Sequence, residues 1–251
     1  MKVLAVNVGN SRVSAGWCED GEAVRAASAG GASAGLLRAV AGRETKPDAV
    51  AWASVAPRKD ASAERAMEAA FPGVPRVRVG AGSVLGIGVD LENPGQTGAD
   101  RYADAVAGER RFGAPCIVCD FGTATTFNLV LPKRGFCGGV IAPGYGMWFQ
   151  ALARGTALLP ELEPGGMRLK TGRNTEQAIR LGARWGFRGM VTEILWQLSK
   201  ACPKGSEPVI AATGGWAERV AEDAGFKMAV VPELTLEGVA LMAERTLAKR
   251  K

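Results

Sequence analysis

Two carboxylates accompanied by glycine turns stand near the middle of the chain. Asp100 follows the loop N-P-G-Q-T-G, and Arg101 comes directly after it, ahead of a predicted helix from Ala103 to Arg111. Positive potential at a helix start should keep Asp100 ionised and able to accept a proton beside a bound anion. Asp120 ends the apolar run C-I-V-C, and Gly122 and hydroxyl residues follow it. Such a turn can hold a phosphate and its cation, although a hairpin whose residues only satisfy turn geometry is the alternative.

The pattern around Asp120 occurs a second time, at the start of the chain. Placing Asn7 over Asp120 aligns Gly9 with Gly122 at an offset of 113 residues (120 − 7), which is near half of the 251-residue chain. Each copy has an apolar strand, Asn or Asp, one apolar residue, glycine, small polar residues and another apolar strand. We therefore predict two similar halves, each opening with a phosphate-binding hairpin, and a nucleotide cleft formed by the two facing hairpins.

Hydrophobic patterns predict strands and helices along the rest of the chain, with a boundary near Gly113-Ala114-Pro115 that gives domains of residues 1–113 and 114–251. Helices are expected at Ala61–Phe71, Met147–Arg154, Thr175–Ser199, from Trp216, and at Leu236–Lys249, and strands at Ala49–Val55, Arg76–Val79, Phe136–Gly144 and Val209–Thr213. Thr175 is the expected N-cap of the long helix, with a glycine-rich interruption near residues 186 and 189. The Gly214-Gly215 turn lets backbone approach an adenine ring, although a plain tight turn fits equally.

Composition narrows the class of protein. The chain is 47% hydrophobic and 22% charged, which is typical of a soluble globular protein. No run approaches the roughly 18 to 20 apolar residues of a membrane span, and no signal-peptide pattern opens the sequence, so we expect a cytoplasmic protein with no membrane partner. The net charge of +6 is dispersed and fits anionic nucleotides as well as nucleic acid, but no aromatic-interleaved basic patch indicates nucleic acid, so we expect no nucleic-acid partner.

The chain has no histidine and five cysteines. Without histidine, Ser-His-Asp and Cys-His catalysis are excluded, so a general base must be a carboxylate, lysine, tyrosine or thiolate. An odd number of scattered cysteines fits reduced thiols. Cys116 and Cys119 form a C-x-x-C within a strand-like run, where positions three apart face opposite ways, so we expect no zinc site.

Taken together, the motifs resemble those of the type III pantothenate kinases, members of the acetate kinase, sugar kinase, Hsp70 and actin superfamily. The matching motifs are V-G-N-S, N-P-x-x-x-G-A-D-R, D-F-G-T-A-T-T, G-G-V-I-A-P-G, G-R-N-T, and A-T-G-G followed by L-T-L-E-G. The order and separation of G-A-D-R and D-F-G-T-A-T-T are the most specific. The resemblance implies an α/β fold of two ribonuclease-H-like (actin-like) domains with a nucleotide cleft between them. It also implies transfer of the ATP γ-phosphate to the terminal hydroxyl of pantothenate, the first step of coenzyme A biosynthesis.

The resemblance also implies residue roles. Asp100 would be the base that accepts the hydroxyl proton, Asp120 would hold a monovalent cation (K⁺ or NH₄⁺), and Mg²⁺ would accompany ATP. Thr175 would reach pantothenate, typically from the neighbouring subunit of a dimer. The implied acceptor-side residues are Leu91, Gly98, Ala99, Asp100, Arg101 and Thr175. The implied ATP-side residues are Asn7, Val8, Gly9, Asn10, Ser11, Arg12, Val13, Ser14, Thr123, Gly214 and Gly215.

Two positions depart from the family pattern, which usually has aspartate at Asn7 and tyrosine at Leu91. Asparagine offers a metal only a neutral oxygen, so we expect Asn7 to be a weak ligand on the magnesium side. Unit charges about 4 Å apart interact by about 4 kcal/mol at an effective dielectric of about 20. Loss of the negative charge at position 7 could therefore slow phosphoryl transfer by the isolated chain. One interpretation is an active kinase, as a homodimer or as one subunit of a mixed assembly with a related chain. The other is a catalytically weak or inactive relative that acts as a nucleotide- or partner-binding regulatory subunit.

Overall fold

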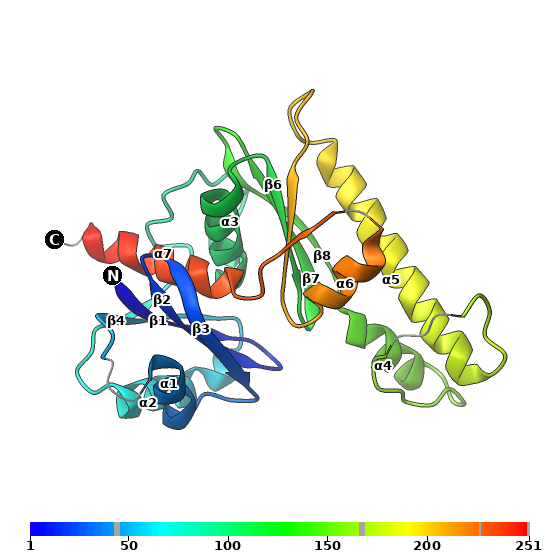
Figure 1. Ribbon diagram of the computed structural model, residues 1–251, viewed down its shortest axis with the longest axis horizontal. Helices are drawn as coiled ribbons and strands as arrows, with labels where there is room; N and C mark the ends of the chain where they lie inside the picture. Colours follow the sequence, from blue (N-terminus) through cyan, green and yellow to red (C-terminus); the bar gives the residue numbers. More distant parts are fainter. Residues whose placement is uncertain (43–45, 166–168, 226, 250–251) are drawn as a thin grey trace. The chain divides into compact units, whose positions relative to one another are not determined.

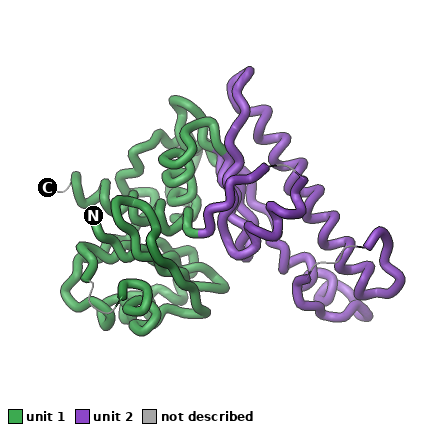
Figure 2. Tube along the Cα trace, in the orientation of Figure 1, with its two compact units in different colours: residues 1–116, 130–138, 233–251 green, residues 117–129, 139–232 purple. Residues whose placement is uncertain are grey.

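A computed structural model describes residues 1–42, 46–165, 169–225 and 227–249, which form two five-stranded mixed sheets with helices around them (Figure 1). By contacts along the chain, residues 1–116, 130–138 and 233–251 group into unit 1, and residues 117–129 and 139–232 into unit 2 (Figure 2). Within the described residues, no helix is both long enough and apolar enough to cross a membrane.

Unit 1 is built on a sheet with the strand order β3-β2-β1-β4-β5. Its strands are β1 (Lys2–Val8), β2 (Val13–Glu19), β3 (Glu22–Ala29), β4 (Ala49–Ser54) and β5 (Arg76–Arg78). β1 pairs antiparallel with β2 and parallel with β4, so the first predicted hairpin is confirmed and the end of β1 lies beside the end of β4.

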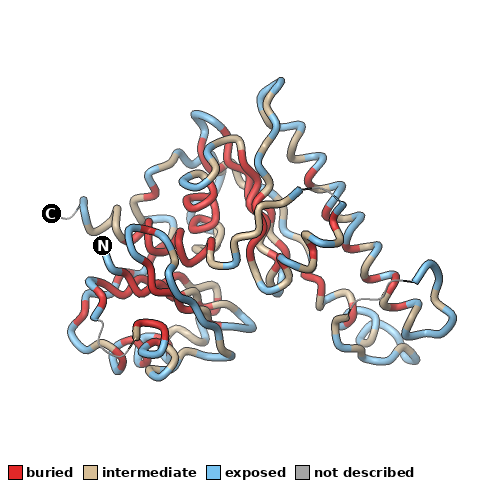
Figure 3. The backbone as a smooth tube through the Cα atoms, viewed as in Figure 1, coloured by how far each residue is buried: buried red, intermediate tan, exposed pale blue. Residues whose placement is uncertain are grey.

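Helices cover both faces of this sheet. α1 (Ala34–Ala41) and α2 (Pro57–Ala70) pack on one face, and α7 (Leu234–Ala248) packs on β1 and β2 from the other, with α3 (Ala99–Phe112) against α7. The alternation of side chains along a strand explains the two layers, because Leu4, Val6 and Val8 join the α1–α2 core while Gly16 lies against Leu236 of α7. Figure 3 shows the buried residues of β1 and the buried stretches of α3 and α7.

Unit 2 carries most of the second sheet, with the strand order β10-β9-β6-β7-β8. Its strands are β6 (Cys116–Phe121), β7 (Ala124–Leu131), β8 (Gly135–Pro143), β9 (Val209–Thr213) and β10 (Ala229–Val230). If the strands of each sheet are numbered from its own first strand in chain order, both sheets have the order 3-2-1-4-5. The shared order confirms both the predicted repeat and the ribonuclease-H-like α/β fold class.

The helices of unit 2 are α4 (Tyr145–Gly155), α5 (Thr175–Ser199) and α6 (Ala217–Ala224). Aromatic rings pack beneath them edge to face: the Phe187 ring centroid lies 6.2 Å from that of Phe121 and 5.3 Å from that of Tyr145, which lies 5.2 Å from that of Trp216. These contacts fix the start of α4 and the start of α6 against the end of β6.

Several predicted details are corrected. α3 begins at Ala99 rather than Ala103, so Asp100 lies inside its first turn. Asn174 caps α5, because its side chain accepts the Gln177 N–H at 2.9 Å, and Thr175 is already helical. The expected interruption of α5 is absent, and the indole of Trp148 occupies the space beside Gly186, whose Cβ would lie 2.5 Å from that ring. α2 begins at Pro57 rather than Ala61, and α1, which begins at Ala34, was not predicted.

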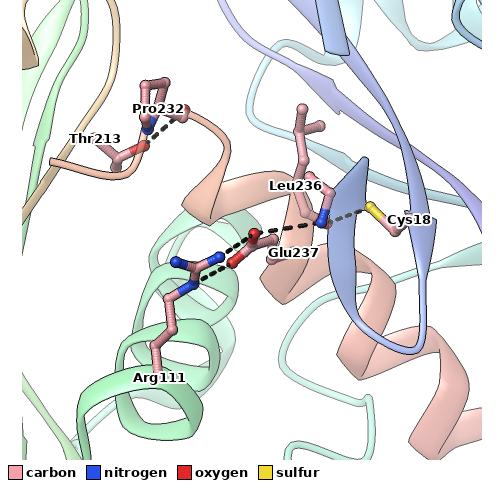
Figure 4. A network of polar contacts seen from close by, with 7 residues as sticks. Cys18, Arg111, Thr213, Pro232, Leu236 and Glu237 are labelled. Atoms are coloured by element: carbon pink, nitrogen blue, oxygen red, sulfur yellow. Dashed lines mark hydrogen bonds and ion pairs between the residues drawn. The ribbon is translucent and has the colours of Figure 1, made fainter. Parts of the chain in front are cut away.

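The C-terminal helix α7 belongs to unit 1 because it is tied to α3 and β2 (Figure 4). Glu237 accepts two hydrogen bonds from Arg111, at 3.0 and 2.9 Å, and Thr235 donates one to the buried Asp104 at 2.7 Å. A Cβ at Gly238 would overlap the carbonyl oxygen of Ala103, so glycine there allows the two helices to touch. The chain first passes from unit 1 to unit 2 at residues 116–117, next to the predicted boundary; the division into domains 1–113 and 114–251 stays a prediction.

Candidate active site

The first hairpin places Asn7 near the end of β1, opposite Ser14 of β2. Its turn closes with a hydrogen bond from Gly9 N–H to the Arg12 carbonyl at 2.9 Å, and Asn10, Ser11 and Arg12 are exposed. The Oδ1 atom of Asn7 is buried and accepts no hydrogen bond from the described residues. A buried oxygen without a donor is available to a cation or to a ligand's hydrogen-bond donor. The hairpin also contacts Lys59 of α2, a residue that no sequence motif marks.

Asp100 lies at the second position of α3, with its carboxylate folded back over the preceding turn. Its Oδ1 accepts the N–H of Arg101 at 2.8 Å, and a Cβ at Gly98 would come within 2.7 Å of the same oxygen and 3.2 Å of Val55 Cγ1. Val55 N–H donates to the Val8 carbonyl at 3.1 Å. Glycine at 98 therefore lets the carboxylate lie beside the carboxyl ends of β1 and β4, where α/β folds place their ligands.

Burial is the largest influence on the Asp100 carboxyl and raises its pKa above the ordinary value, while the Arg101 N–H and guanidinium act in the opposite direction. The expectation that the helix start would govern this group is thus corrected: burial prevails. A raised pKa makes Asp100 a stronger base once it is ionised, which suits proton transfer near neutral pH. Burial also lowers the pKa of Arg101, partly offset by Asp100.

The other predicted acceptor-side residues of unit 1 each have a defined place in that unit. Arg101 lies with its guanidinium carbon 5.7 Å from the centre of the Phe136 ring. Leu91 lies against Gly138, whose Cβ would be 3.2 Å from the Leu91 Cδ2. Ala99 is the first residue of α3. Thr175, by contrast, is exposed at the first residue of α5 in unit 2, so the predicted acceptor-side set is divided between the two units.

The second hairpin brings the predicted ATP-side residues of unit 2 together around Asp120. Gly214 has φ +89° and packs so closely on this carboxylate that a Cβ would overlap Asp120 Oδ1. Trp216 N–H donates to the Phe121 carbonyl at 3.1 Å, which ties the Gly214-Gly215 turn to the end of β6. Gly144, the N-cap of α4, packs in the same way: a Cβ there would overlap the carbonyl oxygen of the exposed Thr123. Two glycine-flanked helix starts thus meet the hairpin that carries Asp120.

Residues 3–197 match the family described as type III pantothenate kinase. The chain belongs to this family. A type III pantothenate kinase of Gluconobacter oxydans is 42% identical over 160 residues, which cover 64% of this chain and 58% of that protein. One of Bacillus cytotoxicus is 38% identical over 192 residues, covering 76% of this chain and 72% of that protein. The chain spans only 58 to 66% of the length of five matched relatives, the first three among them.

Solved structures share the fold at low sequence identity. The activator of the 2-hydroxyisocaproyl-CoA dehydratase from Clostridium difficile, solved with bound ADPNP, has a TM-score of 0.58 and 8% identity, covering 100% of this chain and 97% of that one. A ROK family glucokinase from Streptomyces griseus, in complex with glucose and AMPPNP, has a TM-score of 0.52 and 15% identity, covering 97% and 100%. These likenesses support the two-domain superfamily fold.

The family implies cations beside ATP, and the donor set fits them. Among the described residues, no group of three or more His, Cys, Asp or Glu side chains forms a metal cage. Kinase sites need none, since Mg²⁺ there keeps waters and phosphates and takes one or two carboxylates. Asp120 would be such a carboxylate, and the buried Oδ1 of Asn7 would offer a cation a neutral oxygen.

Proposed function

We propose that the chain transfers the γ-phosphoryl group of ATP to the terminal hydroxyl of pantothenate, giving 4'-phosphopantothenate, the first step of coenzyme A biosynthesis. The observation that carries the proposal is Asp100, a half-buried carboxylate with a raised pKa at the start of α3, in a chain of the type III pantothenate kinase family. A module that only bound nucleotide would need no base at this place.

In this reaction the hydroxyl oxygen of pantothenate attacks the γ-phosphorus, and the bond from that phosphorus to the β–γ bridging oxygen breaks, releasing ADP. The hydroxyl proton passes to a carboxylate oxygen of Asp100. Arg101, the next residue, supplies positive charge for the acceptor's own carboxylate or for the transferred group. Phosphoryl transfer depends on positioning and charge stabilisation rather than on covalent catalysis, and these residues provide both.

On the ATP side, the proposal gives backbone N–H groups of the Asn7–Ser14 hairpin and Thr123 to the phosphates, and the Gly214-Gly215 turn to the adenosine. Asp120 would hold K⁺ or NH₄⁺, and Asn7 would be a weak ligand on the Mg²⁺ side; these cations supply charge neutralisation for the phosphates. Calorimetry of Mg²⁺-ATP binding tests this half separately from catalysis.

Assembly is part of the proposal because Thr175 is implied to serve a neighbouring subunit. We propose that the chain works as a dimer, and that pairing with a related chain that has aspartate at the Asn7 position raises its activity. The specific observation in favour of the alternative, a weak or inactive regulatory subunit, is the neutral Asn7 with its unsatisfied Oδ1. That alternative still needs nucleotide or partner binding.

The deciding experiment is an ATP-dependent phosphorylation assay on pantothenate with the pure chain, with and without K⁺, followed by mass detection of 4'-phosphopantothenate. Product that depends on both substrates supports the kinase. Nucleotide binding without product, in the isolated chain and in its mixtures with related chains, favours the regulatory alternative.

A further inference from the structure

The turn of the first hairpin is held by a side chain from outside it. The Nζ of Lys59, in the first turn of α2, donates to the carbonyls of Asn10 at 2.6 Å, Gly9 at 3.2 Å and Gly30 at 3.4 Å. An ammonium has three N–H donors, and three carbonyls occupy them. Lys59 therefore binds backbone of two separate loops at once and keeps no donor for a ligand.

The first turn of α2 is itself anchored, so Lys59 is presented from a fixed position. Its neighbour Asp60 accepts a hydrogen bond from Ser54 of β4 at 2.5 Å and another from Arg78 of β5 at 2.8 Å. A lysine at a helix start faces the positive end of the helix dipole, which disfavours a cation. Helix stability thus gives no reason for lysine here, whereas the three carbonyl contacts do.

The contacts have a consequence for the other side of the turn. In a trans peptide, the N–H of the next residue points opposite to the carbonyl. Because the carbonyls of Gly9 and Asn10 both point at the ammonium, the N–H groups of Asn10 and Ser11 point away from it. Two successive N–H groups on one side of a turn form a concavity that suits an anion.

We propose that Lys59 is a positioning residue for the phosphates of ATP: it orients the Gly9 and Asn10 peptides so that the Asn10 and Ser11 N–H groups face the bound phosphate. The proposal rests on the proposed function, which gives this hairpin to ATP. The ammonium of Lys59 also places a positive charge beside the turn, whereas the side chain of Asn7 is neutral.

The test measures Mg²⁺-ATP affinity by calorimetry for the wild-type chain, Lys59→Met and Arg58→Met. Arg58 is exposed on the same helix, one residue away, so its variant removes one positive charge without touching the turn. We expect the dissociation constant to rise at least tenfold in Lys59→Met and less than threefold in Arg58→Met. The KM for ATP should rise in parallel, with the KM for pantothenate unchanged. An ATP affinity of Lys59→Met within threefold of wild type overturns the proposal.

Amide exchange separates failure of this proposal from failure of the proposed function. The Gly9 N–H is bonded across the turn, so without nucleotide it should exchange at least tenfold faster in Lys59→Met than in Arg58→Met. If wild type binds no ATP, the proposed function fails, and exchange alone shows whether Lys59 holds the turn. Should Lys59→Met not fold, Lys59→Gln replaces it in both measurements, and wild-type values in it overturn the proposal.

Discussion

The two hairpins are copies of one pattern that are held in place by different means. The β1–β2 turn comprises residues 9–12 and is held through its carbonyls by the ammonium of Lys59. The β6–β7 turn comprises only residues 122–123 and is enclosed by the glycines Gly144 and Gly214. The first copy has the neutral Asn7 where the second has Asp120. We infer that the copies have divided the work, with cation binding at the second and phosphate binding by backbone at the first.

The largest expected effect on turnover comes from Asp100, which lies in α3 and outside both hairpins. Asp100→Asn should lower kcat by about 10²- to 10⁴-fold, since it removes the proposed base, and leave ATP affinity within about threefold. Steady-state kinetics and calorimetry measure the two quantities. Turnover within a few-fold of wild type would eliminate Asp100 as the base.

Replacement of Asp100 should also change how the stability of the protein depends on pH. Because burial raises the Asp100 pKa, the folded protein binds the carboxyl proton of Asp100 more tightly than the unfolded chain does. The contribution of this group to the free energy of unfolding is therefore present at low pH and is lost as pH rises through the folded-state pKa. Asp100→Asn should therefore raise the melting temperature at pH 7. Asp104→Asn, one turn further on, should instead lower it, because Asp104 accepts the Thr235 hydroxyl at 2.7 Å. In wild type, activity should fall on the acid side at a pH above the ordinary aspartate range.

The second effect tests the cation assignment by making the second hairpin resemble the first. Asp120→Asn should reduce kcat/KM about a hundredfold and abolish any stimulation by K⁺, since it removes the carboxylate charge. A K⁺ titration of both proteins measures this. An unaltered K⁺ response in the variant would refute the assignment of Asp120.

A third change removes the glycine support of the second hairpin. Gly214→Ala puts a Cβ into the Asp120 carboxylate at φ +89°, so we expect a loss of about 1 to 3 kcal/mol in unfolding free energy and weaker ATP binding. Gly215→Ala, at the exposed neighbouring position, is the matched control. Equal melting temperatures for the two variants would contradict the close packing at Gly214.

The smallest expected effect makes the first hairpin resemble the second. Asn7→Asp should raise turnover of the isolated chain by about tenfold, or about 1.4 kcal/mol in the barrier, if a lost magnesium contact limits it. Equal, high turnover in both proteins would reject the mixed-subunit proposal, because it would show that asparagine suffices in a homodimer.

Local patterns predicted the parts of the molecule whose contacts are local. Both hairpins follow from alternating apolar residues and glycine, and the helix after G-A-D-R follows from its apolar spacing. β3 (Glu22–Ala29) was missed because it is an edge strand with mostly exposed residues, so it has no alternating hydrophobic face. The N-cap of α5 was misplaced by one residue because Asn174 and Thr175 are both good capping types.

Long-range contacts were beyond such reasoning. Glycine at position 186 predicted a break in α5, yet the Trp148 indole packs there and the helix continues. Lys59 could not be recognised, because its acceptors lie 29 to 50 residues away in sequence. The effect of burial on the Asp100 pKa could not be predicted from the sequence either, because burial depends on the whole fold, and here it outweighs the adjacent Arg101. The predicted roles of these residues remain predictions.

The close contact between Gly238 and Ala103 has a consequence for synthesis of the protein on the ribosome. α3, which carries Asp100, ends at Phe112, and α7 begins at Leu234, so about 120 residues are translated between them. At a translation rate of roughly 5 to 20 residues per second, about 6 to 24 seconds pass between synthesis of α3 and synthesis of α7, the helix that covers Asp104. During that interval a nascent chain exposes an apolar helix face to chaperones. Premature termination before α7 would leave α3 without the helix that packs on it.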